Sequence, residues 1–227
     1  MKALTLLTLL REHAMSVRVD LMISLDGFAT TTDTTPEKPF GDDWGRLTAA
    51  YVATRTMRDR VFHDTSGAGT TGVDDAYARA YFDNTGAEIM GAGKFGLHKF
   101  PDDPGWKGWW GVEPPFHCPV FVLTHAPRPT LEISDTTFHF IDTSIEDALA
   151  RATAAAGGKD VRIGGGPTTV RAFLEADLVD FLHVAIAPIV LGSGIRLWDN
   201  QRGIETRLPS IKSETADSGT IHLTFAR

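Results

Sequence analysis

The sequence is poor in several residue types that define whole classes of protein. It contains one cysteine, Cys118, among 227 residues, which excludes an internal disulfide and a cysteine-built metal centre. We therefore expect no metal site and a reducing, cytoplasmic compartment. Basic residues are also scarce, since 22 lysines and arginines against 29 aspartates and glutamates give a formal net charge of −7. A nucleic-acid-binding surface needs a basic face, so we expect no nucleic-acid partner.

Long apolar runs are missing as well. The run ALTLLTLL at residues 3–10 is far too short to cross a bilayer, so we expect no membrane partner. The first residues imitate a secretory signal, but REHAMS after the apolar run offers no small-residue cleavage site. Residues 1–15 are therefore interpreted as a flexible leader or a misassigned start. The alternative, a true signal, would make this a secreted ligand-binding protein.

Residues 16–227 carry the pattern of a single domain. Short β-prone runs alternate with stretches of helical periodicity, and this order predicts an α/β sheet. The predicted strands are 17–23, 87–91, 119–124, 137–141 and 161–163. The predicted helices are 44–62, 74–82 with Asp74 as its cap, one that Ser144 caps, and one that begins at Pro167. Residues 206–213 and 220–226 flank a turn and predict a terminal antiparallel hairpin.

A triple glycine lies between the strand at 161–163 and the helix that begins at Pro167. Glycines without Cβ atoms let a backbone lie flat against a ligand, and the free N–H groups of a helix start attract anions. Thr168 and Thr169 add hydroxyls at that helix start. The dinucleotide fingerprint G-x-G-x-x-G would have its third glycine at Thr169. The stretch is therefore either a phosphate cradle or a tight turn that packs closely.

Polar residues also follow two other predicted strands, where α/β sheets bind ligands. Asp26 ends the first strand and could orient a substrate or relay a proton, or it could belong to an ordinary Asp-Gly turn. His125, after Thr124, has a side chain that titrates near neutral pH, or it is a hydrogen-bonded loop residue.

The loop at 101–119 holds three tryptophans among glycines and prolines. Such a composition has no helical or strand period. Aromatic side chains in a loop can close a pocket, build a subunit interface, or form a satellite cluster that covers the edge of a sheet. We favour a lid or an interface, and Trp110 is the residue of this loop that we expect on the substrate side.

Four stretches resemble the dihydrofolate-reductase-like superfamily, and in particular the C-terminal reductase domain of bacterial riboflavin-biosynthesis deaminase-reductases. They are VRVDLMISLDGF at 17–28, GAEIMGAGKFG at 86–96, PPFHCPVFVLTH at 114–125 and IGGGPTTVRAFLEADLVDFLHVAIAPIVLGSGIRLW at 163–198. They occur in the family's order and extend the resemblance from residue 16 across nearly the whole chain.

This resemblance implies a three-layer α/β/α fold around a mixed sheet, and a homodimer. It also implies hydride transfer from NADPH to a small heterocyclic or carbonyl-bearing substrate. The cofactor-binding residues that it implies are Gly91, Lys94, Thr124, His125, Gly164, Gly165, Gly166, Pro167, Thr168 and Thr169. The expected substrate-side residues are Asp26, Phe28 and Trp110, with Asp26 as the candidate catalytic residue.

Three positions depart from the family pattern. Where the family commonly reads G-R-x-T, with an arginine and a threonine that meet the adenosine phosphate, residues 91–94 read GAGK. Lys94 is then either a point charge for that phosphate or an exposed surface lysine, so NADP is expected from the resemblance alone and NAD stays open. Gly164 stands where the riboflavin-pathway reductases usually carry a glutamate. These departures leave an alternative: a nucleotide-binding, dimer-forming protein of this fold without turnover.

Overall fold

The computed structural model describes residues 15–35, 37–97, 103 and 105–227. Its centre is a nine-stranded mixed sheet in the order β10-β11-β8-β1-β7-β3-β4-β6-β5. The sheet strands are β1 (Val17–Ser24), β3 (Thr85–Gly91), β4 (Pro119–Leu123), β5 (Leu131–Ile133), β6 (Thr136–Ile141), β7 (Asp160–Gly165), β8 (Phe181–Ala187), β10 (Ser210–Thr215) and β11 (Ile221–Ala226). The prediction of a leader or misassigned start at residues 1–15 concerns residues that the structure does not describe, with the exception of Met15. Met15 packs against the core.

Six neighbouring strands of this sheet, β8, β1, β7, β3, β4 and β6, run parallel. Their carboxyl ends therefore meet along one edge. The ladder between β1 and β7 covers only Val17–Val19, whereas β1 stays paired with β8 as far as Ser24. The carboxyl halves of β1 and β7 consequently separate at the centre of that edge, which is where α/β sheets place ligands.

Two helices cover one face of the sheet, α6 (Ile145–Ala155) and α7 (Pro167–Glu175). Both begin where local chemistry predicts, because the Ser144 hydroxyl accepts the Asp147 N–H and Pro167 occupies the first turn of α7. Phe173 on α7 and Ile163 on β7 are fully buried in the main hydrophobic core, which lies between these helices and the sheet. Burial of each such side chain stabilises the fold by about 2 kcal/mol.

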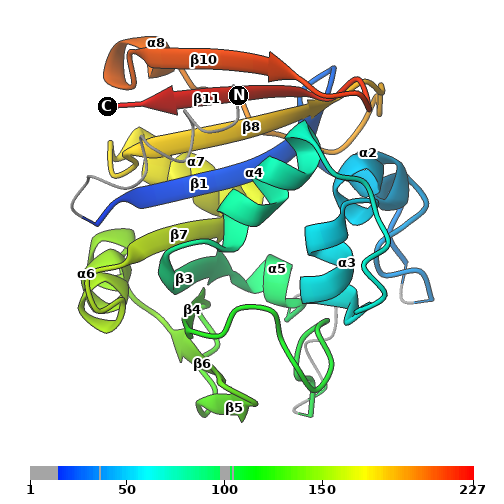
Figure 1. Ribbon diagram of the computed structural model, residues 1–227. Helices are drawn as coiled ribbons and strands as arrows, with labels where there is room; N and C mark the ends of the chain where they lie inside the picture. Colours follow the sequence, from blue (N-terminus) through cyan, green and yellow to red (C-terminus); the bar gives the residue numbers. More distant parts are fainter. Residues whose placement is uncertain (1–14, 36, 98–102, 104) are drawn as a thin grey trace.

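The opposite face carries α2 (Asp43–Val52), α3 (Arg55–Phe62) and α4 (Val73–Phe82). Figure 1 shows α4 crossing in front of the central strands while α7 lies behind them, so the three-layer α/β/α prediction is confirmed. The sheet face beneath α4 is polar. The ring of Tyr77 stacks on His183 and His222, with centroids 4.3 and 4.1 Å apart.

The single helix predicted over 44–62 is wrong, because the structure has two helices there. Thr54 is extended, with ψ at 150°, and its backbone pairs with Thr70. Its hydroxyl accepts the Met57 N–H and so caps α3. The predicted cap of the next helix is also wrong, because Gly72 is the N-cap residue and Asp74 lies inside the first turn of α4.

The terminal hairpin is confirmed as the antiparallel pair β10–β11. The sequence prediction began it at residue 206, but the short helix α8 (Ile204–Arg207) precedes it. A second, two-stranded sheet was not predicted and pairs β2 (Phe28–Thr30) with β9 (Ile195–Arg196). Among the described residues, no helix is both long enough and apolar enough to cross a membrane.

Candidate functional site

Two glycine segments that are distant in sequence meet at the carboxyl edge of the sheet. Strand β3 ends at Gly91 beside β7, which ends at Gly165, with Met90 paired to Gly165. A Cβ atom on Gly91 would lie 2.5 Å from Oγ1 of Thr169, so a side chain at this position would force Thr169 to shift. The structure thus brings together the predicted cofactor residues of the two segments, on β3 and at the start of α7.

The start of α7 has the features of an anion-binding terminus. Gly166 is the N-cap residue and Pro167 follows it. The backbone N–H groups of Thr168 and Thr169 belong to the first turn, where a helix provides no acceptor for them. A Cβ atom on Gly166 would meet no heavy atom within 4 Å, so the space in front of this turn is open. These observations fit a bound pyrophosphate group.

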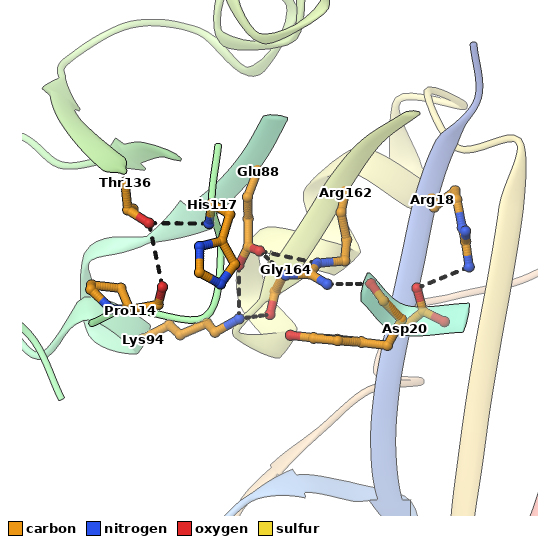
Figure 2. A network of polar contacts seen from close by, with 10 residues as sticks. Arg18, Asp20, Glu88, Lys94, Pro114, His117, Thr136, Arg162 and Gly164 are labelled. Atoms are coloured by element: carbon orange, nitrogen blue, oxygen red, sulfur yellow. Dashed lines mark hydrogen bonds and ion pairs between the residues drawn. The ribbon is translucent and has the colours of Figure 1, made fainter. Parts of the chain in front are cut away.

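A buried ion cluster lies beside Gly164, the first residue of the triple glycine (Figure 2). Glu88 on β3 is fully buried, and one of its oxygens accepts hydrogen bonds from the Arg162 guanidinium on β7. Its other oxygen accepts from Nζ of Lys94 at 3.0 Å. Burial opposes ionisation of Glu88, but Arg162 and Lys94 outweigh it and hold the pKa of this carboxyl below its usual value.

The structure excludes one of the two alternatives that the sequence offered for Lys94, that of an exposed surface lysine. The lysine belongs to the short helix α5 (Ala92–Phe95), and its ammonium also donates to the Gly164 carbonyl at 2.6 Å. Its side chain is 23% exposed, so it is not a freely solvated surface lysine. A Cβ atom on Gly164 would lie 2.0 Å from Oε1 of Glu88, so a side chain at this position would displace the Glu88 carboxylate.

Sequence analysis missed Glu88 and Arg162. Both residues interrupt otherwise apolar strands, as in AEIM and VRIG, and each is at least 98% buried. The guanidinium also lies 3.6 Å from the ring centroid of Tyr81 and donates to the Tyr81 carbonyl. A charge inside an apolar strand was the available signal, because such residues are almost never fully buried without a partner.

Asp26 lies at the turn after β1. Its carboxylate accepts the Ser24 hydroxyl at 2.6 Å and the N–H groups of Leu191 and Gly192 at 3.1 and 2.7 Å. The Ser24 hydrogen bond, together with those from the backbone, lowers the pKa of Asp26 to about 2. The side chain joins two loops as an ionised acceptor, which favours the turn interpretation over that of a proton donor.

Phe28 and Trp110 are both packed rather than freely presented. Phe28 is 7% exposed, and the Arg196 guanidinium lies 4.3 Å from its ring centroid. Trp110 stacks on Phe138 and meets Phe116 edge-on. The tryptophan loop therefore includes a satellite hydrophobic cluster over β4 and β6, the alternative that the sequence had not favoured. Substrate contact at these two residues stays a prediction.

Thr124 and His125 follow β4, the strand beside β3. Thr124 is buried, and its hydroxyl accepts the Ala126 N–H in a local turn. The His125 side chain is 99% exposed and bonds the Asp142 carboxylate at 2.9 Å. Because Gly91 pairs with Leu123, Thr124 comes directly after the point where β4 lies beside the end of β3. His125 is therefore on the same edge of the sheet, but it points into solvent.

The mixed sheet, its antiparallel hairpin and its covering helices define a protein of the dihydrofolate-reductase-like fold class. The chain belongs to the RibD C-terminal domain family, whose model matches residues 15–222. No curated protein sequence matches the chain.

Solved structures share this fold. A protein from Shewanella sp. PV-4, described as a riboflavin biosynthesis protein, is 21% identical with a TM-score of 0.60, over 94% of this chain and 99% of that one. RibD from Acinetobacter baumannii is 15% identical with a TM-score of 0.51. The deaminase/5-amino-6-(5-phosphoribosylamino)uracil reductase from Thermotoga maritima is 14% identical with a TM-score of 0.50. Both matches cover 94% of this chain. They cover only 58% of the Acinetobacter protein and 57% of the Thermotoga protein, which are longer.

Proposed function

We propose that the protein is an NADPH-dependent reductase that transfers a hydride to a small heterocyclic or carbonyl-bearing substrate. The family and the fold support a reductase in general. The single observation that supports a dinucleotide cofactor is the arrangement at the start of α7. Gly91 packs against this helix start, and there is open space at Gly166, next to backbone N–H groups that have no acceptor within the helix. NADPH is proposed because the family uses it, and NADH is the alternative donor.

In this proposal the residues of the chain bind and orient. Thr168 and Thr169 offer N–H and hydroxyl donors to a pyrophosphate at the start of α7, and the open space at Gly166 leaves room for its approach. The dihydronicotinamide ring, when bound, supplies the hydride. The protein's contribution is to hold donor and acceptor carbons at reacting distance.

The proton that accompanies the hydride comes from water in this proposal. Asp26, with a pKa of about 2, is ionised near neutral pH and has no proton to give. Its carboxylate instead fixes the loop of Leu191 and Gly192 beside the turn after β1. We propose that this bracing shapes the substrate side of the site, together with Phe28.

The test is a thermal-shift titration with NADPH and NADH of the wild type, Gly166→Asp and Gly166→Ala. Gly166 has φ at −67° and open space at its Cβ, so the added side chains meet no neighbouring atom. Aspartate is also a good helix cap, so the apo protein keeps its melting temperature. We expect ligand stabilisation of the wild type and the alanine variant, and its loss in Gly166→Asp, whose carboxylate repels phosphate.

The proposal fails if neither dinucleotide moves the melting temperature of the wild type at millimolar concentration. It also fails for this site if Gly166→Asp is stabilised as much as wild type. In that case the triple glycine is only a turn.

A further inference from the structure

Lys94 is the cation nearest to the triple glycine, and its ammonium is already engaged. It donates to Oε1 of Glu88 at 3.0 Å and to the Gly164 carbonyl at 2.6 Å. Figure 2 shows its side chain running beneath the strand ends, with Nζ between these two acceptors. An ammonium has three N–H donors, so two of the three are directed into the protein.

Moving this ammonium toward a ligand would be costly. Glu88 is fully buried, and within the described chain its partners are Arg162 on one oxygen and Lys94 on the other. Removal of one partner from a buried ion pair leaves an uncompensated charge, which is strongly destabilising. The pKa of Lys94 also indicates that the ion pair is favourable. Burial opposes the charge of Lys94, yet Glu88 raises the pKa of this lysine.

The second acceptor links Lys94 to the proposed cradle. Gly164 is the first of the three glycines and lies at the irregularity between Ile163 and Gly165 in the pairing of β7 with β3. Its carbonyl accepts a hydrogen bond from the ammonium. Gly165 follows with φ at +109°, a conformation that favours glycine. The cluster of Glu88, Arg162 and Lys94 thus supports the turn at the Gly164 carbonyl.

We infer that Lys94 is a positioning residue: it fixes the Gly164–Gly166 turn and does not bind the adenosine phosphate of the cofactor. This inference rests on the proposed function. It departs from the role that the family pattern suggests for this position. It means that the preference for NADPH or NADH does not depend on Lys94, because the turn meets the pyrophosphate that both dinucleotides share.

The experiment measures Kd for NADPH and for NADH by isothermal titration calorimetry in wild type, Lys94→Met, Lys94→Arg and Lys159→Met. Lys159 is the matched control, an exposed lysine that precedes the amino end of β7 at the opposite edge of the sheet. We expect Lys94→Met to weaken both dinucleotides by about tenfold, the scale of one hydrogen bond to a charged group. The ratio of the two Kd values stays within twofold of wild type. Lys94→Arg recovers most of the affinity, and the control changes nothing.

Two outcomes overturn the inference while the proposed function stands. One is a loss of NADPH binding in Lys94→Met with NADH binding unchanged, as a phosphate-binding cation requires. The other is no change for either dinucleotide. If wild type binds neither, the proposed function fails and this inference fails with it.

A measurement on the wild type covers the case in which Lys94→Met does not fold. Reductive methylation of lysines, followed by mass spectrometry, reports how available each ammonium is. We expect Lys94 to react at least tenfold more slowly than Lys159 without any ligand, and equally slowly with NADPH or NADH. Protection of Lys94 that appears only with NADPH contradicts the inference.

Discussion

Individual buried side chains form a hydrogen-bonded chain beneath α4. Oδ1 of Asp20 contacts Nδ1 of His183 at 3.2 Å, and Nε2 of His183 contacts Nδ1 of His222 at 3.0 Å. Nε2 of His222 contacts Oδ1 of Asp74 at 2.9 Å. The two imidazoles thus connect the Asp20 carboxylate on β1 to the Asp74 carboxylate on α4.

The environment of His222 disfavours its charged form. Burial and the charge of His183 lower the pKa of His222 to about 4, against the opposing effect of Asp74. At neutral pH His222 is then neutral.

His222 makes stability depend on pH in a defined direction. Its pKa is about 4 in the folded protein and 6.5 unfolded, so the unfolded chain binds more protons between these values. The free energy of unfolding therefore falls as pH is lowered from 6.5 to 4. His222→Gln keeps an acceptor and a donor but removes the titration. In urea denaturation at a series of pH values, we expect the free energy of unfolding of His222→Gln to fall by about 2 kcal/mol less than that of the wild type between pH 6.5 and pH 4.

The control for this measurement is His63→Gln, which replaces an exposed histidine. It should leave the acid slope of the wild type intact. An unchanged slope in His222→Gln would show that the buried chain does not contribute to acid sensitivity.

Among the secondary-structure elements, the start of α3 shows how one side chain divides two helices. The Thr54 hydroxyl donates to the Tyr51 carbonyl at the end of α2 and accepts the Met57 N–H at the start of α3. Thr54→Ala removes both contacts from a fully buried position. We expect it to lower the free energy of unfolding by about 1–2 kcal/mol in chemical denaturation.

The matched control is Thr48→Ala. The Thr48 hydroxyl donates to the Trp44 carbonyl on the surface of α2, so its replacement by a better helix former should change stability by less than about 0.5 kcal/mol. If the two alanine variants lose the same stability, the cap of α3 contributes nothing specific.

Elements that begin with a local signal were predictable from the sequence. Ser144 caps α6 and Pro167 opens α7, because those signals lie within four residues of the helix start. The break at Thr54 was not predictable in this way. It depends on a backbone pairing with Thr70, across a loop that the sequence marks only as polar.

For the whole molecule, we propose the homodimer that the resemblance implies, and the edge of the sheet suggests where to test it. All six side chains of β10 are exposed, and this strand ends the described sheet. Ile211 on β10 is 48% exposed and Ile221 on β11 is 37% exposed. An exposed edge strand with apolar side chains readily pairs with another chain.

We therefore expect a dimer mass in size-exclusion chromatography with light scattering, and a monomer for Ile211→Lys. The control is Val112→Lys, at an 89% exposed apolar residue on the tryptophan loop. A monomeric wild type contradicts the homodimer. If the Ile211→Lys variant is still a dimer, the dimer interface does not include this edge of the sheet.

The sequence by itself determined the order of the main strands and helices, apart from the division at Thr54, together with the terminal hairpin and the glycine turn before α7. Each of these depends on periodicity or on residues that are close in the chain, such as Gly164–Gly166 beside Pro167. The resemblance of four motifs then pointed to the family, which the family model confirms over residues 15–222.

Only the tertiary structure decided how the site is built. Gly91 meets Thr169 because β3 and β7 are neighbours in the sheet, a pairing that no local pattern encodes. The same pairing sets Glu88 opposite Arg162 and brings Lys94 to the Gly164 carbonyl. Partners of buried charges are chosen by strand order and register, which depend on the packing of the whole chain. The sequence shows which residues are charged, and the fold decides which of them meet.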